Sequence, residues 1–150
     1  MATGRLRLPL FPRWIRLSLV AAVMGLILYY SVIPVPGSGT FRTGPFGVLG
    51  LSKWLHLLAY GGLAATLAYA FHDSSRPTWQ ILAVVFLIAV GYGAGVEVVQ
   101  AAVPDRTYSP RDMLVNATGA AMAVGLWRVV VEYVRFYRVR GLEELETPVG

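Results

Sequence analysis

Residues 90–123, VGYGAGVEVVQAAVPDRTYSPRDMLVNATGAAMA, decide how the chain is interpreted. Both halves of this stretch are apolar enough to lie in a membrane. It nevertheless carries a set of polar and ionisable residues: Glu97, Gln100, Asp105, Arg106, Arg111, Asp112 and Asn116. Ionisable groups are costly in lipid, and those that occur there usually serve a function. We therefore expect two membrane helices joined by a short turn, with a functional site beside them.

The composition also indicates a membrane protein. The chain has 150 residues, of which 56% are hydrophobic and 14% charged, and its mean hydropathy is +0.59. Soluble domains carry about 25% charged residues. The absence of cysteine excludes disulfides and thiolate chemistry from this chain. The net charge of +5 is spread between apolar runs, so it predicts orientation in a bilayer rather than nucleic-acid binding.

Four apolar runs predict four transmembrane helices, at residues 15–35, 51–71, 79–101 and 110–131. Each run is long enough to cross roughly 30 Å of hydrocarbon at about 1.5 Å per residue. The first run follows a basic segment, as in a signal peptide, but it is longer than a usual signal core and no A-x-A-like site follows it, which favours a retained helix. The expected fold is an all-α integral membrane bundle forming one domain over residues 1–150.

The lysines and arginines predict the orientation of this bundle. With the N-terminus in the cytoplasm, nine of the 13 lie inside and four lie outside, namely Arg42, Lys53, Arg106 and Arg111. The positive-inside rule then places both termini on the cytoplasmic side of the cell membrane. Beyond residue 127 a helical charge pattern with Arg128, Glu132 and Arg135 on one face predicts an amphipathic C-terminal extension, within a cytoplasmic tail at 132–150.

In this orientation the polar residues of three helices lie at one depth, near the outer surface. Helical spacing gives three stripes, formed by Lys53, His56 and Tyr60, by Glu97 and Gln100, and by Asp112 and Asn116. Facing stripes predict a polar pocket in which Lys53, Arg106 and Arg111 balance Glu97 and Asp112. Gly91, Gly95 and Gly119 predict close packing of helices.

Most of these residues also have a structural explanation. The alternatives are a snorkelling role for Lys53, a core hydrogen bond for His56, a helix cap with Ser109 and Pro110 for Asp112, and interhelical bonding for Asn116. Glu97 is different, because it lies within an apolar helix where no cap needs it. Placing a charge there costs about 2.5 to 3.5 kcal/mol. For Glu97 we expect a role in the site, directly or as a partner of Lys53 or Arg106.

Three segments resemble the VanZ-like family of small membrane proteins, which is named for a teicoplanin-resistance accessory protein. They are KWLHLLAYGGL (53–63), GVEVVQ (95–100) and DRTYSPRDMLVNATGA (105–120), so the resemblance covers residues 52 to about 125. It implies a cell-envelope protein with this polar set at its core and a connection to antibiotic resistance, without a settled activity. Ser52 stands where the family often has an acid, which argues against an acid–lysine pair on that helix.

Three functions fit these patterns. The first is binding of an anionic amphiphile, such as a lipid-linked cell-wall or glycan intermediate or a glycopeptide-related ligand, with membrane lipids as partners and Lys53, Arg106 and Arg111 meeting phosphate. The second is an intramembrane enzyme with Glu97 or His56 as acid–base group. The third is a purely structural, ion-paired bundle.

The chain lacks a nucleophile elbow, an H-E-x-x-H motif and a phosphate-binding loop, which favours binding over catalysis. His56, Glu97 and Asp112 make only a weak metal signal, so we expect no metal and no cofactor. One small chain without a visible repeat is an unusual transporter, although a homo-oligomer would reopen that possibility.

Overall fold

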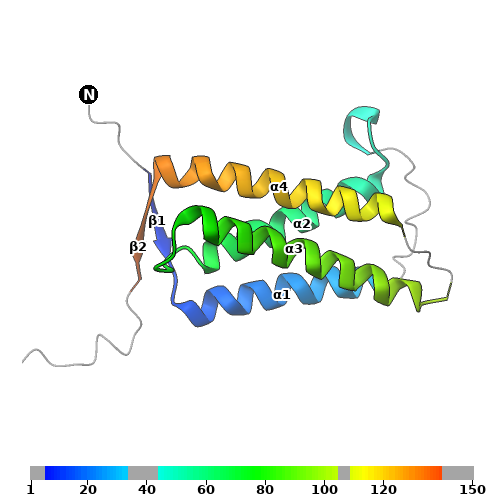
Figure 1. Ribbon diagram of the computed structural model, residues 1–150, viewed down its shortest axis with the longest axis horizontal. Coiled ribbons are helices and arrows are strands. Elements are labelled where there is room, and N and C mark those ends of the chain that lie inside the picture. Colours follow the sequence, from blue (N-terminus) through cyan, green and yellow to red (C-terminus); the bar gives the residue numbers. More distant parts are fainter. Residues whose placement is uncertain (1–5, 34–43, 105–108, 140–150) are drawn as a thin grey trace, which may run out of the picture.

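The computed structural model describes residues 6–33, 44–104 and 109–139. In this part of the chain four α-helices form an antiparallel bundle: α1 (Arg13–Val32), α2 (Leu51–Ala70), α3 (Thr78–Ala101) and α4 (Pro110–Tyr133) (Figure 1). Their ends differ by at most three residues from the sequence-based bounds. A single 3-10 turn, Pro45–Gly47, precedes α2. The mostly helical bundle is therefore confirmed.

Helices α1, α3 and α4 are long and apolar enough to cross a membrane, so the chain is a multi-pass membrane protein. Helix α2 does not belong to this group, because polar residues such as Lys53 and His56 and the small residues Gly61 and Gly62 interrupt it. It contacts all three other helices, as α3 also does. Its 20 residues correspond to about 30 Å, the thickness of the hydrocarbon core.

Helices α2 and α4 pack with their backbones in close approach. A Cβ atom added to Gly119 would collide with the backbone carbonyl of Leu57, and one added to Gly61 would lie 3.3 Å from the carbonyl oxygen of Gly119. The expectation of close packing is confirmed at Gly119. It is wrong within this chain for Gly91 and Gly95, which are exposed and would have no atom within 4 Å of an added Cβ.

Two short strands pair at one end of the bundle, which we call the sheet end (Figure 1). Strand β1 (Leu6–Leu10) lies parallel to β2 (Val134–Arg138), with Leu8 opposite Phe136. The predicted amphipathic extension is therefore wrong, because α4 ends at Tyr133 and the chain continues as a strand. The cause is an alternation that favours a strand over a helix, since Val134 and Phe136 are half-buried and Arg135 and Tyr137 are exposed.

A buried arginine joins the helices at the sheet end. Arg16 of α1 is only 2% exposed, and its two terminal nitrogens donate to the Asp73 carboxylate at 3.0 and 2.8 Å. The same side chain donates to the carbonyls of Tyr69 and Ala70 at 3.1 and 2.7 Å, which satisfies the C-terminus of α2. The Arg16 guanidinium holds the pKa of Asp73 below its ordinary value. This contact fixes α1 to the turn between α2 and α3.

Candidate functional site

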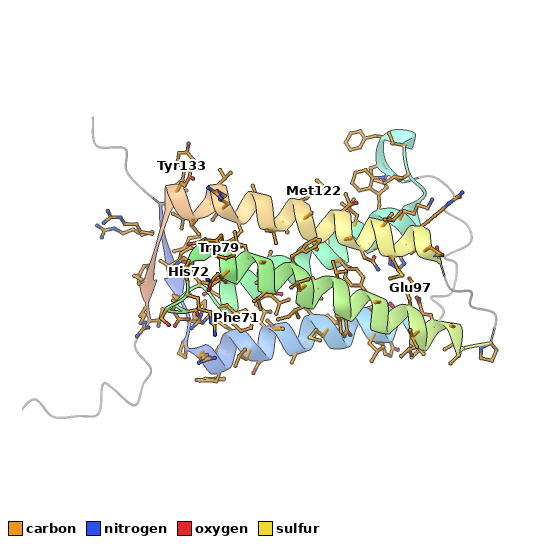
Figure 2. The ribbon with its side chains drawn as sticks, viewed as in Figure 1. Phe71, His72, Trp79, Glu97, Met122 and Tyr133 are labelled. Carbon is orange, nitrogen blue, oxygen red and sulfur yellow. The ribbon has the colours of Figure 1, made fainter. Side chains whose placement is uncertain are left out.

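The end of the bundle opposite the sheet gathers polar side chains from three helices, and we call it the polar end. Figure 2 shows Glu97 there, far from His72 at the sheet end. The start of α2 brings Lys53 and His56, the end of α3 brings Glu97 and Gln100, and the start of α4 brings Asp112 and Asn116. The structure thus places these residues at one level of the bundle. Arg106, the remaining predicted member, lies outside the described residues.

The centre of the polar end is a contact between α2, α3 and α4. His56 Nδ1 lies 3.0 Å from Asn116 Oδ1, which joins α2 to α4. The ring of Tyr60, one turn further along α2, is parallel to that of His56 with a centroid separation of 6.4 Å. On α3, a Cβ at Gly93 would lie 3.0 Å from the Tyr60 ring and 3.3 Å from Asn116 Nδ2. The missing side chain of Gly93 therefore gives space to both groups.

Two buried donors at this contact lack a partner. Among the residues that the structure describes, neither the Tyr60 hydroxyl nor the Asn116 amide nitrogen makes a hydrogen bond. Tyr60 is 1% exposed and Asn116 is 2% exposed, so both groups are withdrawn from bulk solvent. A buried polar group without a partner costs about 1 to 3 kcal/mol. Oxygen atoms of a ligand or of water entering this region would satisfy them.

Glu97 connects the end of α3 to the start of α4. Its side chain is buried, and Oε2 accepts a hydrogen bond from the backbone nitrogen of Ser109 at 3.2 Å. The Ser109 hydroxyl in turn accepts from the backbone nitrogen of Asp112 at 3.3 Å, and Pro110 occupies the first turn. The helix cap expected at Ser109 is therefore confirmed.

The expected charge balance is not observed in the described part of the chain. No lysine or arginine nitrogen at residues 6–33, 44–104 or 109–139 lies within 4 Å of the carboxylates of Glu97 or Asp112. The ion pairs predicted for Lys53 and Arg111 are therefore wrong for these residues. A structural, ion-paired bundle involving Lys53 or Arg111 loses its support, because neither cation has a carboxylate partner among the described residues.

Helix α1 forms a wall of the site that the sequence did not predict. Gln100 Nε2 donates to the carbonyl oxygen of Ser31 at 3.0 Å, and the Tyr92 hydroxyl donates to the carbonyl of Met24 at 2.6 Å. Both bonds attach α3 to α1. Backbone carbonyls are present in every residue and leave no sequence signal, so helical spacing could not reveal these contacts.

A cavity of about 710 Å³ lies between α1 and α2 at the polar end. Its polar lining includes His56, Tyr60 and Gln100, and the rest is mostly aliphatic. Leu26 and Leu58, which line it, are 57% and 62% exposed, so the cavity opens at the lipid-facing surface. Its volume is in the range of small-molecule sites, about 300 to 1,000 Å³. The predicted pocket between the second, third and fourth helices is therefore displaced toward α1.

The chemistry of the site centres on His56. Because Nδ1 contacts the Asn116 carbonyl and the ring lines the cavity, Nε2 is the ring nitrogen left for a ligand. In the described residues no group of three His, Asp or Glu side chains could hold a metal ion, so His56, Glu97 and Asp112 do not form one. The arrangement offers two donors, the Tyr60 hydroxyl and the Asn116 amide nitrogen, and one acceptor, His56 Nε2, near the end of an apolar cavity.

Comparison with known proteins gives one match. The VanZ/LLP1 family matches residues 10–131, from the end of β1 through nearly all of α4. The match extends beyond the 52–125 region of the resemblance and includes α1, the helix that forms one wall of the cavity. No curated protein and no solved structure matched.

Proposed function

This chain belongs to the VanZ/LLP1 family of membrane proteins, and we propose that it binds an anionic amphiphile in the cavity between α1 and α2. The observation that carries the proposal is the form of this cavity. It is mostly apolar, open at the lipid-facing surface and lined in part by the polar side chains of His56, Tyr60 and Gln100. A lipid chain would occupy the apolar part, and an oxygen-rich head group would reach the buried donors.

Anionic head groups are favoured by the charges near the polar end. Lys53 lies one turn before His56, and Arg111 is exposed at the start of α4. Neither has a carboxylate within 4 Å among the described residues. Together with Arg106 they could form charge-assisted hydrogen bonds to a phosphate. Lipid-linked cell-wall or glycan intermediates combine the required long chain and phosphate, and a family link to glycopeptide resistance agrees with such a ligand.

The proposed orientation places the polar end outside the cell. Seven of the nine described lysines and arginines belong to the sheet end, at Arg7, Arg13, Arg16, Arg76, Arg128, Arg135 and Arg138. The positive-inside rule favours this end in the cytoplasm. Because the first and last described elements, β1 and β2, pair with each other, both chain ends would then leave on the cytoplasmic side.

A cavity-filling substitution tests the proposal. Gly62 lines the cavity, and a Cβ added there would meet no atom within 4 Å, so Gly62→Phe should fill the space while the helices keep their packing. Gly91→Phe is the matched control, because Gly91 is exposed on α3 with equally open surroundings. Mass spectrometry of lipids that copurify with each protein should show the amphiphile lost from Gly62→Phe and kept by Gly91→Phe. Equal lipid profiles would rule out the cavity as the binding site.

His56 Nε2, which makes no hydrogen bond to a described residue, favours a second function, catalysis on the bound amphiphile. With Nδ1 engaged by Asn116, a neutral His56 could take a proton from a hydroxyl or water at the cavity. His56→Gln should then keep the amphiphile bound but stop its conversion, measured by mass spectrometry during incubation with membrane lipid extract. An unchanged conversion rate, or no conversion by the wild-type protein, would leave binding as the function.

A further inference from the structure

The sheet end carries a pair of arginines that the cavity does not involve. Arg7 of β1 and Arg135 of β2 are direct partners in the parallel register. Leu10 of β1 and Phe136 of β2 face the helices, since Leu10 is 5% exposed and the ring centroids of Phe136 and His72 are 4.3 Å apart. Successive strand residues alternate between faces, so Arg7 and Arg135 lie together on the face away from the bundle. Figure 2 shows nitrogen-tipped side chains extending from this sheet away from the helices.

This pairing costs free energy in the isolated protein. Like charges directly opposite each other destabilise a sheet, and a two-stranded sheet has little stability of its own. In the described chain the carboxylate of Asp73 is engaged by Arg16 at 2.8 Å and approached by Arg138 at 3.6 Å. No described carboxylate lies within 4 Å of Arg7 or Arg135. Within the described residues the pair is therefore a double positive charge without a carboxylate partner, and backbone pairing holds its two strands in register.

We propose that Arg7 and Arg135 bind the phosphate of an anionic phospholipid at the membrane surface. One phosphate can accept charge-assisted hydrogen bonds from two guanidinium groups, which converts their repulsion into a shared attraction. The sheet lies where such head groups occur, because the exposed aromatic residues Trp14, Trp79 and Tyr137 at this end have the character of an interfacial belt. This site is at the opposite end of the bundle from the proposed amphiphile cavity and is independent of it.

The first test compares two variants with the same change in charge. Arg7→Gln/Arg135→Gln removes the pair, whereas Arg76→Gln/Arg128→Gln removes two exposed arginines of the same end that lie outside the sheet. Native mass spectrometry of the full chain in neutral detergent would follow titration with phosphatidylglycerol and with phosphatidylcholine. Loss of the pair should weaken phosphatidylglycerol binding about 25-fold, roughly five-fold for each arginine. Phosphatidylcholine binding should not change. Equal losses in both variants would overturn the proposal in favour of diffuse charge.

The second test uses melting temperature, because the proposal predicts a change of sign. Without anionic lipid, Arg7→Gln/Arg135→Gln should melt at or above the wild-type temperature, since a repulsion has been removed. With phosphatidylglycerol, the wild-type protein should be stabilised more than the variant. A variant that melts lower without lipid would overturn the proposal, because the pair would then stabilise the fold directly.

Two further experiments test whether the C-terminal segment or a free anion occupies the arginine pair instead of a phospholipid. Glu143→Gln/Glu144→Gln/Glu146→Gln neutralises the acidic C-terminal segment, which lies outside the described residues. If this variant binds phosphatidylglycerol many-fold more tightly than the wild-type protein, the segment occupies the arginine pair and the proposal fails. If inorganic phosphate stabilises the wild-type protein as well as the lipid does, the ligand is a free anion and not a phospholipid. Unchanged affinity in the first arm and no effect of phosphate in the second would support the lipid site.

Discussion

The two ends of the bundle differ in how far their buried polar groups are paired. At the sheet end, the two terminal nitrogens of Arg16 make four hydrogen bonds, to Asp73 and to the carbonyls of Tyr69 and Ala70, and its Nε alone has no partner among the described residues. At the polar end, the described residues supply no partner for the Tyr60 hydroxyl or the Asn116 amide nitrogen. Paired buried groups hold elements together, whereas two unpaired donors beside the cavity call for a further partner such as water or a ligand atom. The comparison therefore separates a structural end from an end suited to a ligand.

The largest effect should follow from removing the buried arginine. Arg16→Met leaves the Asp73 carboxylate and two carbonyls of α2 without their donor. We expect a loss of about 3 kcal/mol in unfolding free energy, at the low end for a broken buried pair because Asp73 keeps 28% exposure to solvent. Denaturant unfolding in detergent would measure it. Arg13→Met, an exposed arginine on the same helix, is the matched control and should change stability by less than about 0.5 kcal/mol.

The second-largest effect should follow from disturbing the contact between α2 and α4. Gly119→Ala would place a methyl group against the backbone carbonyl of Leu57, which cannot rotate away. Forced separation of the helices should cost about 1 to 3 kcal/mol. It should also weaken amphiphile binding, because Asn116 lies one turn before Gly119. Gly125→Ala on the same helix meets no atom within 4 Å and should be neutral or slightly stabilising. Similar melting temperatures for both variants would contradict the close approach.

A smaller effect distinguishes the two ends most directly. Tyr60→Phe removes a buried hydroxyl that has no described partner, so the ligand-free protein should lose little stability or gain some. Binding of the amphiphile should weaken by about five-fold, equivalent to one hydrogen bond of roughly 1 kcal/mol. Lipid titration and thermal unfolding of the same preparations would provide both values. A strongly destabilised Tyr60→Phe protein would mean that the hydroxyl has a structural role and would remove the contrast between the ends.

The sequence predicted the parts of this arrangement that depend on long patterns. Apolar runs predicted the four helices. Spacing at three and four residues predicted that His56, Tyr60 and Asn116 lie on facing stripes. The strand pair was missed because the charges at Arg128, Glu132 and Arg135 also fit a helix, although Val134 and Phe136 alternate with exposed neighbours.

Other features had no sequence signal at all. The α1 wall of the cavity consists of Tyr30, Ser31 and aliphatic side chains, which are ordinary residues of a membrane helix. Arg16 is one of several arginines in a basic segment, and nothing local distinguishes the buried one from its exposed neighbour Arg13. Such contacts join residues more than 50 positions apart, so they depend on the packed fold.

The smallest expected effect concerns acid sensitivity at the sheet end. His72 packs against Phe136 and Trp127, and burial lowers its pKa below the ordinary value of about 6.5. The folded protein therefore favours neutral His72, and this contribution to stability is complete above about pH 6.5. It decreases as the pH falls through the lowered pKa, because the unfolded chain binds the proton more tightly.

His72→Phe should remove this part of the acid response between neutral pH and the range where Asp73 titrates. The Asp73–Arg16 pair adds a separate loss only below about pH 4, since the pKa of Asp73 is also lowered. Melting temperatures of both proteins from pH 7 to pH 4 would measure the difference, and parallel curves would show that His72 does not contribute.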